Sequence, residues 1–427
     1  MTLSPGRLLR PFATALTAGL LAGCGIVPGT GDDTPPVTVM TWAPWKTRTT
    51  DMAGMPALAS AYARAVNADG GLAGHELRVL TCNERDTSIG AGRCARRAVA
   101  EGAVAVVGSY GRHADTALPI LETAGIPYIG GYGLTSAEFA GAFTYPVHAG
   151  QAALLAGSGL QLAKECGRVA LVRPDTLAGD ALPPLIDAGL ATAGRPRATD
   201  VKAPEDGSGF DTEAGAALAA VGTGTAAGGG EEDGGGCVMA ALGARTDSFF
   251  DSFRRLRTPG RPVVVASVLG SVGQSVVNRS GGGSGLFEGA FVTGWYPVAS
   301  DRRWDPMRKV ISEHAFGDNR IDPADAGPQT TWIAYEVLRQ AVGAAGGGEI
   351  TAEKLVRVLD GGLKVDTGGL TPLLDWSYDG LKTFGPYLRV GNAHVTFQRV
   401  RDGELVASGE RDFVDVTAPL DRARVGE

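Results

Sequence analysis

The sequence lacks the short motifs that mark the most common catalytic and nucleotide-binding sites. It contains no G-x-S-x-G, no Walker A motif, no H-E-x-x-H, and no G-x-G-x-x-G after its first expected strand. Each of these patterns serves a specific chemistry. His113 and His148 lie near the expected ligand loops, but neither accompanies a recognisable nucleophile. Binding without catalysis is therefore the main hypothesis, and an exported hydrolase that uses His113 is one alternative.

Histidine, cysteine and clustered basic residues are also scarce. The five histidines are scattered and the five cysteines form no C-x-x-C pair, so we expect no metal and no other cofactor. The net charge is −7 and no run of Lys and Arg stands out, so nucleic acid is not an expected partner. Beyond the N-terminal leader, no apolar stretch reaches the length of a transmembrane helix.

Residues 1–24 have the pattern of a secretion signal. Two arginines give a basic start, and the apolar stretch 12–21 is too short to span a bilayer. The leader ends in Leu-Ala-Gly-Cys at Cys24, which resembles a bacterial lipobox. We therefore expect a lipidated Cys24 that anchors the exported protein to the outer face of the cell membrane. The alternative is an ordinary secretory leader with a chance cysteine. Residues 25–36 are expected to form a flexible tether.

The four cysteines other than Cys24 are expected to form two disulfides, because their number is even and export favours oxidation. Cys82 ends a predicted strand, and Cys94 lies in the helix expected to fold back over it. Cys166 and Cys237 each precede an apolar stretch, and parallel neighbouring strands would bring those two starts together. Of the three possible connectivities we prefer Cys82–Cys94 with Cys166–Cys237. Four buried free thiols are the alternative.

A strand–helix–strand unit spans residues 104–136. The runs 104–107 and 126–129 are apolar and rich in β-branched residues, and a stretch of helical length separates them. Ligands of open α/β sheets bind at the carboxyl ends of the strands, where glycine lets the backbone come close. We therefore predict that the loops 108–113 and 130–136 carry the function.

Strands and helices alternate in two series, one before about residue 147 and one after it. A chain of this length is expected to form two lobes, and the alternation predicts an α/β protein with doubly wound sheets. Residues 222–236 are dominated by glycine and carry three acidic residues. Such a composition cannot bury apolar surface, so we expect a disordered surface loop there.

Four segments resemble the type I periplasmic-binding-protein family, in the branch that includes the branched-chain amino-acid binding proteins of ABC importers. Their order along the chain matches the family, and together they span nearly the whole mature sequence. They are AYARAVNADGGLAGHELRVLTCNERD (61–86), VAVVGSYGRHADTALPILETAGIPYIG (104–130), DAGPQTTWIAYEVLRQAV (325–342) and VDTGGLTPLLDWSYDGLK (365–382).

The resemblance implies two Rossmann-like lobes joined by three crossovers, with a small-molecule ligand in the cleft between them and hinge closure on binding. Lobe 1 would comprise residues 37–147 and 297–368, and lobe 2 residues 148–296 and 369–427. A monomer would deliver the ligand to the membrane permease of an ABC importer. A ligand-sensing lipoprotein of the same fold is the alternative.

The resemblance also implies ligand residues in lobe 1. Family members hold a carboxylate with hydroxyl and backbone N–H groups, and Thr135 matches the family threonine. Arg112 could pair an acidic group bidentately, and Trp45 lies where some relatives place an aromatic over the ligand. The alternatives are an exposed arginine, a helix N-cap for Thr135 and a packing role for Trp45. The expected set is Trp45, Tyr110, Gly111, Arg112, Gly133, Thr135 and Ser136.

Lobe 2 departs further from the family pattern. Ala178 stands where relatives often have an aromatic residue, so Asp175 or Thr176 is expected to reach the cleft; a surface position is the alternative for Asp175. Arg245 aligns near a cleft tyrosine, and Ser267 aligns near the acid that binds the ammonium of amino-acid ligands. Ser267 is not an acid, and burying a ligand ammonium group without a carboxylate would be costly. The expected ligand is therefore a small polar molecule, either an amino acid or, because that acid is missing, another small polar or anionic molecule.

Overall fold

The computed structural model describes residues 34–47, 50–205, 207, 209–222, 235–257 and 263–423. The expected leader with Cys24, the tether up to residue 33 and residues 223–234 of the expected glycine loop lie outside the described residues. No helix of the described part of the chain is both long and apolar enough to cross a membrane.

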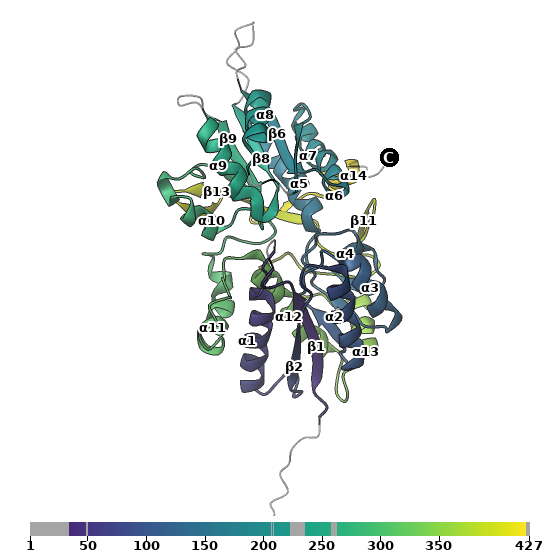
Figure 1. Cartoon of the computed structure of the whole chain (residues 1–427). Coiled ribbons are helices and arrows are strands. Elements are labelled where there is room, and N and C mark those ends of the chain that lie inside the picture. The colour runs from purple at the N-terminus through teal and green to yellow at the C-terminus, as the bar shows by residue number, and fades with distance from the viewer. Residues whose placement is uncertain are drawn as a thin grey trace, which may run out of the picture. The chain divides into compact units, whose positions relative to one another are not determined.

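The first sheet is parallel, and its strands lie in the order β2-β1-β3-β4-β5. Every residue of β1 is buried because helices cover both faces of the sheet (Figure 1). Side chains alternate along the strand, so Val39 packs in the core with α1 and α12, and Met40 in the core with α2 and α3. The strands are β1 (Val37–Ala43), β2 (Leu77–Asn83), β3 (Ala105–Val107), β4 (Tyr128–Ile129) and β5 (Thr144–Tyr145).

Seven helices of the described residues belong with this sheet. The loop after β3 packs closely on α12, where the Thr331 hydroxyl donates to the carbonyl of Gly108 over 3.0 Å. α12 therefore packs against the carboxyl end of β3 and is hydrogen-bonded to the loop that follows it. The helices are α1 (Gly54–Ala68), α2 (Ser88–Ala100), α3 (Ala114–Thr123), α4 (Ala137–Ala140), α11 (Asp305–His314), α12 (Ala326–Ala344) and α13 (Ala352–Asp360).

The second sheet has the order β14-β13-β10-β9-β8-β6-β7, with β15 paired to β13. Its strands β6 to β10 run parallel, whereas β13 runs antiparallel to β10. The strands are β6 (Arg168–Pro174), β7 (Thr199–Ala203), β8 (Gly236–Ala240), β9 (Val263–Val268), β10 (Phe291–Gly294), β13 (His394–Arg401), β14 (Glu404–Ala407) and β15 (Val414–Asp415). Its helices are α5 (Gly150–Leu162), α6 (Leu177–Asp180), α7 (Leu182–Leu190), α8 (Asp211–Val221), α9 (Thr246–Leu256), α10 (Gln274–Arg279) and α14 (Thr417–Arg422).

The chain passes between the two sheets three times: after β5, after β10 and before β13. The short hairpin β11 (Lys382–Phe384) and β12 (Tyr387–Val390) contacts α4, and the Tyr387 ring lies 5.2 Å from the ring of Phe139. Because these contacts belong to the first sheet, we propose that lobe 1 extends to about residue 390 rather than ending at residue 368.

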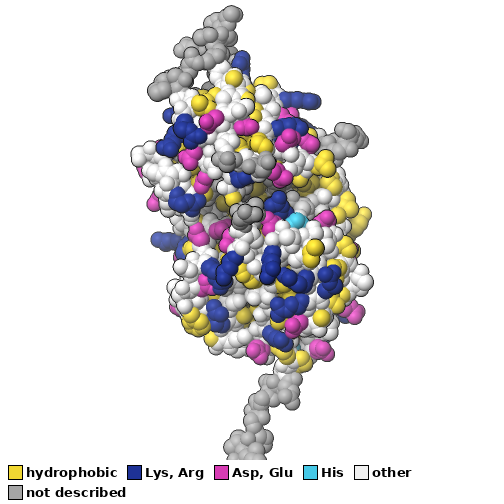
Figure 2. Space-filling model, in the orientation of Figure 1, with side chains coloured by type: hydrophobic (Ala, Val, Ile, Leu, Met, Phe, Trp, Pro, Cys, Tyr) yellow, Lys and Arg dark blue, Asp and Glu magenta, His cyan; other side chains and the backbone are white. Residues whose placement is uncertain are grey.

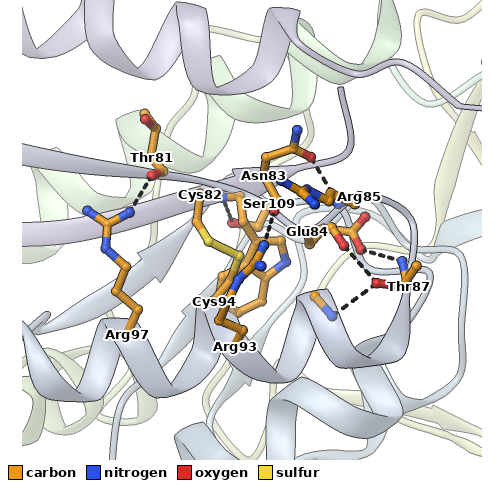
Figure 3. The surroundings of a disulfide bond; sticks show 12 residues. Thr81, Cys82, Asn83, Glu84, Arg85, Thr87, Arg93, Cys94, Arg97 and Ser109 are labelled. Carbon is orange, nitrogen blue, oxygen red and sulfur yellow. Dashed lines mark hydrogen bonds between the residues drawn. A yellow bond between two sulfur atoms is a disulfide. The ribbon is translucent and has the colours of Figure 1, made fainter. Parts of the chain in front are cut away.

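Both preferred disulfides are present. Cys82 at β2 pairs with Cys94 on α2 (Figure 3), and Cys166 pairs with Cys237 on β8. The strands β6 and β8 are adjacent and parallel, so their starts lie together as expected, with Val169 opposite Cys237. Beside the first disulfide, Arg97 of α2 donates to the carbonyl of Thr81 over 3.0 Å, so charge-assisted bonds add to the covalent link between α2 and β2.

Candidate functional site

The loop after β3 meets strands β1 and β4 around Ser109, which is fully buried. The Trp42 backbone N–H donates to the Ser109 hydroxyl over 3.0 Å, and the Tyr128 hydroxyl donates to the Ser109 carbonyl over 3.1 Å. The Trp42 indole N–H donates to the carbonyl of Tyr110 over 2.9 Å. Ser109 therefore joins the loop after β3 to strands β1 and β4.

A carboxylate of the chain itself lies against the expected anion-binding loop. Glu138 on α4 accepts the backbone N–H groups of Gly133 at 3.0 Å, Leu134 at 2.8 Å and Thr135 at 3.3 Å. Its side chain is buried, and burial raises the pKa of Glu138 although the three N–H donors act in the opposite direction. The Thr135 hydroxyl donates to the carbonyl of Gly111 over 3.4 Å. These groups are thus bonded within the protein.

Aromatic side chains from the loops after β3 and β4 contact residues that follow β9 and β10 of the second sheet. The Tyr132 ring lies 5.4 Å from the Tyr110 ring and 5.5 Å from the Trp295 ring, in an edge-to-face arrangement with the latter. A Cβ built on Gly270, after β9, would lie 2.7 Å from the Tyr132 hydroxyl. Tyr132 thus spans from the β4 loop of one sheet to the β9 loop of the other. No motif or pattern in the sequence singled out Tyr132 or Trp295.

Arg112 pairs with acidic residues of both lobes. Its guanidinium lies 3.3 Å from Asp86 and 3.8 Å from Glu205, which follows β7. About 45% of its side chain is exposed. Figure 2 shows acidic and basic side chains side by side where the two halves meet. Arg112 therefore joins the lobes through carboxylates of the chain.

The remaining expected ligand residues also make internal contacts. Trp45 exchanges backbone bonds with the Asn83 carboxamide, and Ser136 begins α4 without a side-chain capping bond. The other contacts are the Asp175–Lys202 ion pair at 3.2 Å, the Thr176 hydroxyl capping the N–H of Gly179 at 3.0 Å, the Arg245 guanidinium donating to the Pro204 carbonyl, and the Ser267 hydroxyl donating to the Ala240 carbonyl at 2.7 Å.

Ser88 and Asp86 lie near the two ring nitrogens of His113, which resembles the order of groups in a hydrolase triad. The Ser88 hydroxyl lies 3.2 Å from Nδ1 of His113. However, Nε2 of His113 is 3.6 Å from Asp86, beyond hydrogen-bond distance, and Asp86 pairs with Arg112 at 3.3 Å. A triad needs the acid to orient the imidazole through a hydrogen bond. The arrangement therefore gives no support to the hydrolase alternative.

A cavity of about 380 Å³ lies beside the second crossing. Its walls come from the ends of β9 and α10, the crossing segment 297–300, the start of α12, and the β13–β14 hairpin. Gln329 on α12 and Gln398 on β13 line it and are buried, each with 2% of its surface exposed. None of the expected ligand residues lines this cavity.

The polar groups of the cavity define what it can bind. Nε2 of Gln329 donates to the Pro323 carbonyl over 3.1 Å, and Nε2 of Gln398 donates to the Tyr296 carbonyl over 3.0 Å. Neither Oε1 atom accepts a hydrogen bond from a described residue. Asp402 and Glu404 also line the cavity, and no Lys or Arg of the described ranges does. The cavity therefore suits a hydrogen-bond donor that is neutral or cationic. The described residues contain no cluster suited to a metal ion.

A family model described as periplasmic binding protein matches residues 49–401. No curated protein matches the sequence. Among solved structures, a substrate-binding periplasmic protein from Ralstonia solanacearum is 15% identical with a TM-score of 0.70, covering 87% of this chain and 100% of that chain.

Two further solved structures have the same fold. A possible leucine/isoleucine/valine-binding protein from Rhodopirellula baltica SH 1 is 16% identical, with a TM-score of 0.68 and coverage of 89% and 98%. A fatty acid ABC transporter substrate-binding protein from Thermomonospora curvata is 12% identical, with a TM-score of 0.68 and coverage of 90% and 94%. The ligand classes in these two descriptions differ, so the shared fold does not specify a ligand.

Proposed function

The chain belongs to the periplasmic binding protein family, and on that premise we propose that it captures a small polar solute between its lobes for an ABC importer. The observation that carries the proposal is the cavity of about 380 Å³ lined by groups of both lobes. Gln329 comes from α12 on the first sheet, and Gln398 comes from β13 of the second. A solute that donates to both carboxamide oxygens would hold the lobes together.

The cavity replaces the expected cleft loops as our proposed site. Most of the expected ligand residues make hydrogen bonds or ion pairs within the protein, whereas the carboxamide oxygens of Gln329 and Gln398, two residues that line the cavity, accept no hydrogen bond from a described residue. An acceptor that the protein itself leaves unpaired is open to a donor of a bound solute. A bound solute that supplies two donors would pair with both oxygens, which gives the cavity a physical reason to select such a molecule.

The proposal includes export and anchoring through a lipidated Cys24, as a monomer that meets a membrane permease. These features rest on the Leu-Ala-Gly-Cys pattern and on the family. Replacing Cys24 (Cys24→Ala) should release the protein from membranes in the native host. Retention of the variant in the membrane fraction would contradict the lipid anchor without affecting the binding proposal.

A thermal-shift screen of amino acids, amides, amines, polyols, nucleosides and small acids tests solute capture. A solute at one hundred times its dissociation constant should stabilise the protein by about 2.7 kcal/mol. Gln329→Leu and Gln398→Leu should each abolish that shift, whereas Gln340→Leu, on the same helix as Gln329 but outside the cavity, should retain it. Turnover of a solute, or shifts unchanged in both cavity variants, would overturn the proposal.

A further inference from the structure

Two glutamines that line the cavity are held so that their oxygens are the free groups. The carboxamide of Gln398 faces the Tyr296 carbonyl at 3.0 Å, and the carboxamide of Gln329 faces the Pro323 carbonyl at 3.1 Å. A carbonyl oxygen can only accept, so in both residues the atom that faces it must be the NH2 nitrogen, Nε2. The oxygen of each side chain is thereby left as an acceptor, and a flipped carboxamide would lose its hydrogen bond.

The chain around Gln398 is shaped to hold it in this position. A Cβ built on Gly294, at the end of β10, would lie 2.6 Å from Nε2 of Gln398, so a side chain there would displace the carboxamide. The Thr396 hydroxyl accepts a second hydrogen bond from Nε2 over 3.1 Å. Although Gln329 and Gln398 are each 2% exposed, neither oxygen is among the fully buried, unpartnered side-chain atoms of the described chain, so each keeps accessible surface. The cavity therefore presents two acceptors in fixed positions.

The donors on the hairpin side of the cavity are already used within the protein. Glu288 accepts the backbone N–H groups of Asp402 and Gly403, each over 3.0 Å, at the turn between β13 and β14. Nε2 of Gln274 on α10 donates to the Gly403 carbonyl and to the Asn278 side-chain oxygen, each over 2.8 Å. A bound molecule therefore meets more acceptors than donors, and it has to supply donors of its own.

Two carboxylates stand where the cavity opens to solvent. Asp402 and Glu404 line the cavity and are exposed, and neither forms an ion pair within the described part of the chain. Arg401 lies opposite Glu404 in the hairpin, but it does not line the cavity. No Lys or Arg of the described residues belongs to the wall. The opening is therefore negatively charged, which favours the entry of a cation and disfavours an anion.

We propose that the solute is an organic cation that presents an ammonium group with N–H donors to the oxygens of Gln329 and Gln398. Asp402 and Glu404 would balance its charge. This inference rests on the proposed solute capture and names its substrate class. An ammonium group of a primary amine has three donors and no acceptor, so it matches a wall with spare acceptors and few donors. A quaternary ammonium lacks the N–H groups and a neutral alcohol lacks the charge, so each matches the wall only in part.

The first test uses the wild-type protein with matched four-carbon probes in isothermal titration calorimetry. 1,4-Diaminobutane is compared with 1,4-butanediol and with its fully N-methylated, bis-quaternary derivative. The diamine should bind at least tenfold more tightly than either, and its affinity should fall as salt is added. Equally tight binding of the diol would show that charge does not select the solute. Equally tight binding of the quaternary derivative would show that the carboxamide oxygens do not; either result overturns the inference.

The second test neutralises the two carboxylates with Asp402→Asn and Glu404→Gln in one variant. Asp402 has a φ of 54°, a conformation that asparagine also tolerates, so the turn should be kept. The variant should bind the diamine at least tenfold more weakly and lose most of the salt dependence. The control combines Asp379→Asn with Glu410→Gln, which removes the same charge from exposed residues outside the cavity, and should bind like wild type. Equal losses in the variant and the control would show a general effect of net charge and reject the role of the cavity carboxylates.

The outcomes separate this inference from the proposed function. If a neutral solute binds at least as tightly as the diamine and Gln329→Leu abolishes its binding, solute capture stands and the ammonium class is wrong. Diamine binding that survives both Gln329→Leu and Gln398→Leu would place the amine outside the cavity and overturn the inference. If neither an amine nor any other solute binds, both proposals fail. If the carboxylate variant does not fold, the wild-type probes and the glutamine variants decide.

Discussion

His148 lies flat on Trp295, with the ring centroids 4.1 Å apart and the ring planes only 4° from parallel. His148 stands in the first passage between the sheets, and Trp295 directly follows β10 in the second. Both side chains also bind Gly150: its N–H donates to Nδ1 of His148 at 3.0 Å, and its carbonyl accepts the Trp295 indole N–H at 2.8 Å. The stack therefore joins two of the three passages about which the lobes would move.

This arrangement predicts acid sensitivity at the hinge. Burial lowers the pKa of His148 from 6.5 to about 3. The unfolded chain therefore binds a proton between these values that the folded chain does not, so stability falls as the pH decreases from 6.5 towards 3, by up to about 1.4 kcal/mol per pH unit. Urea unfolding from pH 7.5 to 4.5 should show a flatter dependence for His148→Asn than for wild type.

Asparagine is a suitable replacement because its oxygen can accept the Gly150 N–H and it does not titrate. His314→Gln, at the end of α11 and outside the stack, serves as the control and should keep the wild-type slope. Equal slopes for wild type and His148→Asn would show that other groups govern the acid sensitivity.

The raised pKa of Glu84 predicts a contribution to stability that changes with pH in the opposite direction to that of His148. Glu84 is buried, accepts the Thr87 N–H at 3.2 Å, and burial followed by the charge of Asp86 raises its pKa from 4.5 to about 7. The folded protein thus holds a proton that the unfolded chain releases, so this contribution is complete below pH 4.5 and is lost as the pH rises through 7. Glu84→Gln should stabilise the protein at pH 8 by up to about 3 kcal/mol and have little effect at pH 4.5. A destabilised variant at pH 8 would contradict this.

The strands and disulfides of the molecule could be predicted from the sequence, but the contacts made by the loops after the strands could not. Short apolar runs rich in β-branched residues, with glycine-rich ends, located β3, β4 and the loops after them, because these signals are local. The Cys166–Cys237 pair followed from adjacent parallel strands. Glu138 was missed because its partners lie three to five residues earlier, and only the loop geometry aims their N–H groups at it.

The cavity is lined by residues that lie far apart in the sequence. Gln329 lay within a segment of family resemblance, but its neighbour across the cavity, Gln398, comes from a strand that pairs antiparallel with β10. The Tyr132–Gly270 approach likewise requires the two lobes to be placed together. No periodicity in the sequence encodes such pairings, so the cleft residues expected from local motifs differ from those that line the cavity.

The contact of Arg112 with Glu205 should be weak despite joining the lobes. Both side chains are about half exposed, at 45% and 56%, and their closest atoms are 3.8 Å apart. A double-mutant cycle with Arg112→Ala and Glu205→Gln should give a coupling energy below about 1 kcal/mol that vanishes in about 1 M salt. The Arg357–Glu353 pair within α13 is the control and should behave similarly. Coupling that is larger and insensitive to salt would indicate a desolvated bridge.

The two disulfides should contribute unequally to stability. Cys82–Cys94 spans 12 residues and Cys166–Cys237 spans 71 residues. A longer closed loop restricts the unfolded chain more, so the chain-entropy relation gives about 3 kcal/mol for the shorter loop and about 4 kcal/mol for the longer one. Replacing both cysteines of a pair by alanine and measuring unfolding in guanidinium should reveal that order, and intact-mass analysis after alkylation should find no free thiol among the four in wild type. If the variant without Cys82–Cys94 loses more unfolding free energy, that disulfide stabilises the protein mainly through its effect on the folded state, where it links α2 to β2, and not by restricting the unfolded chain.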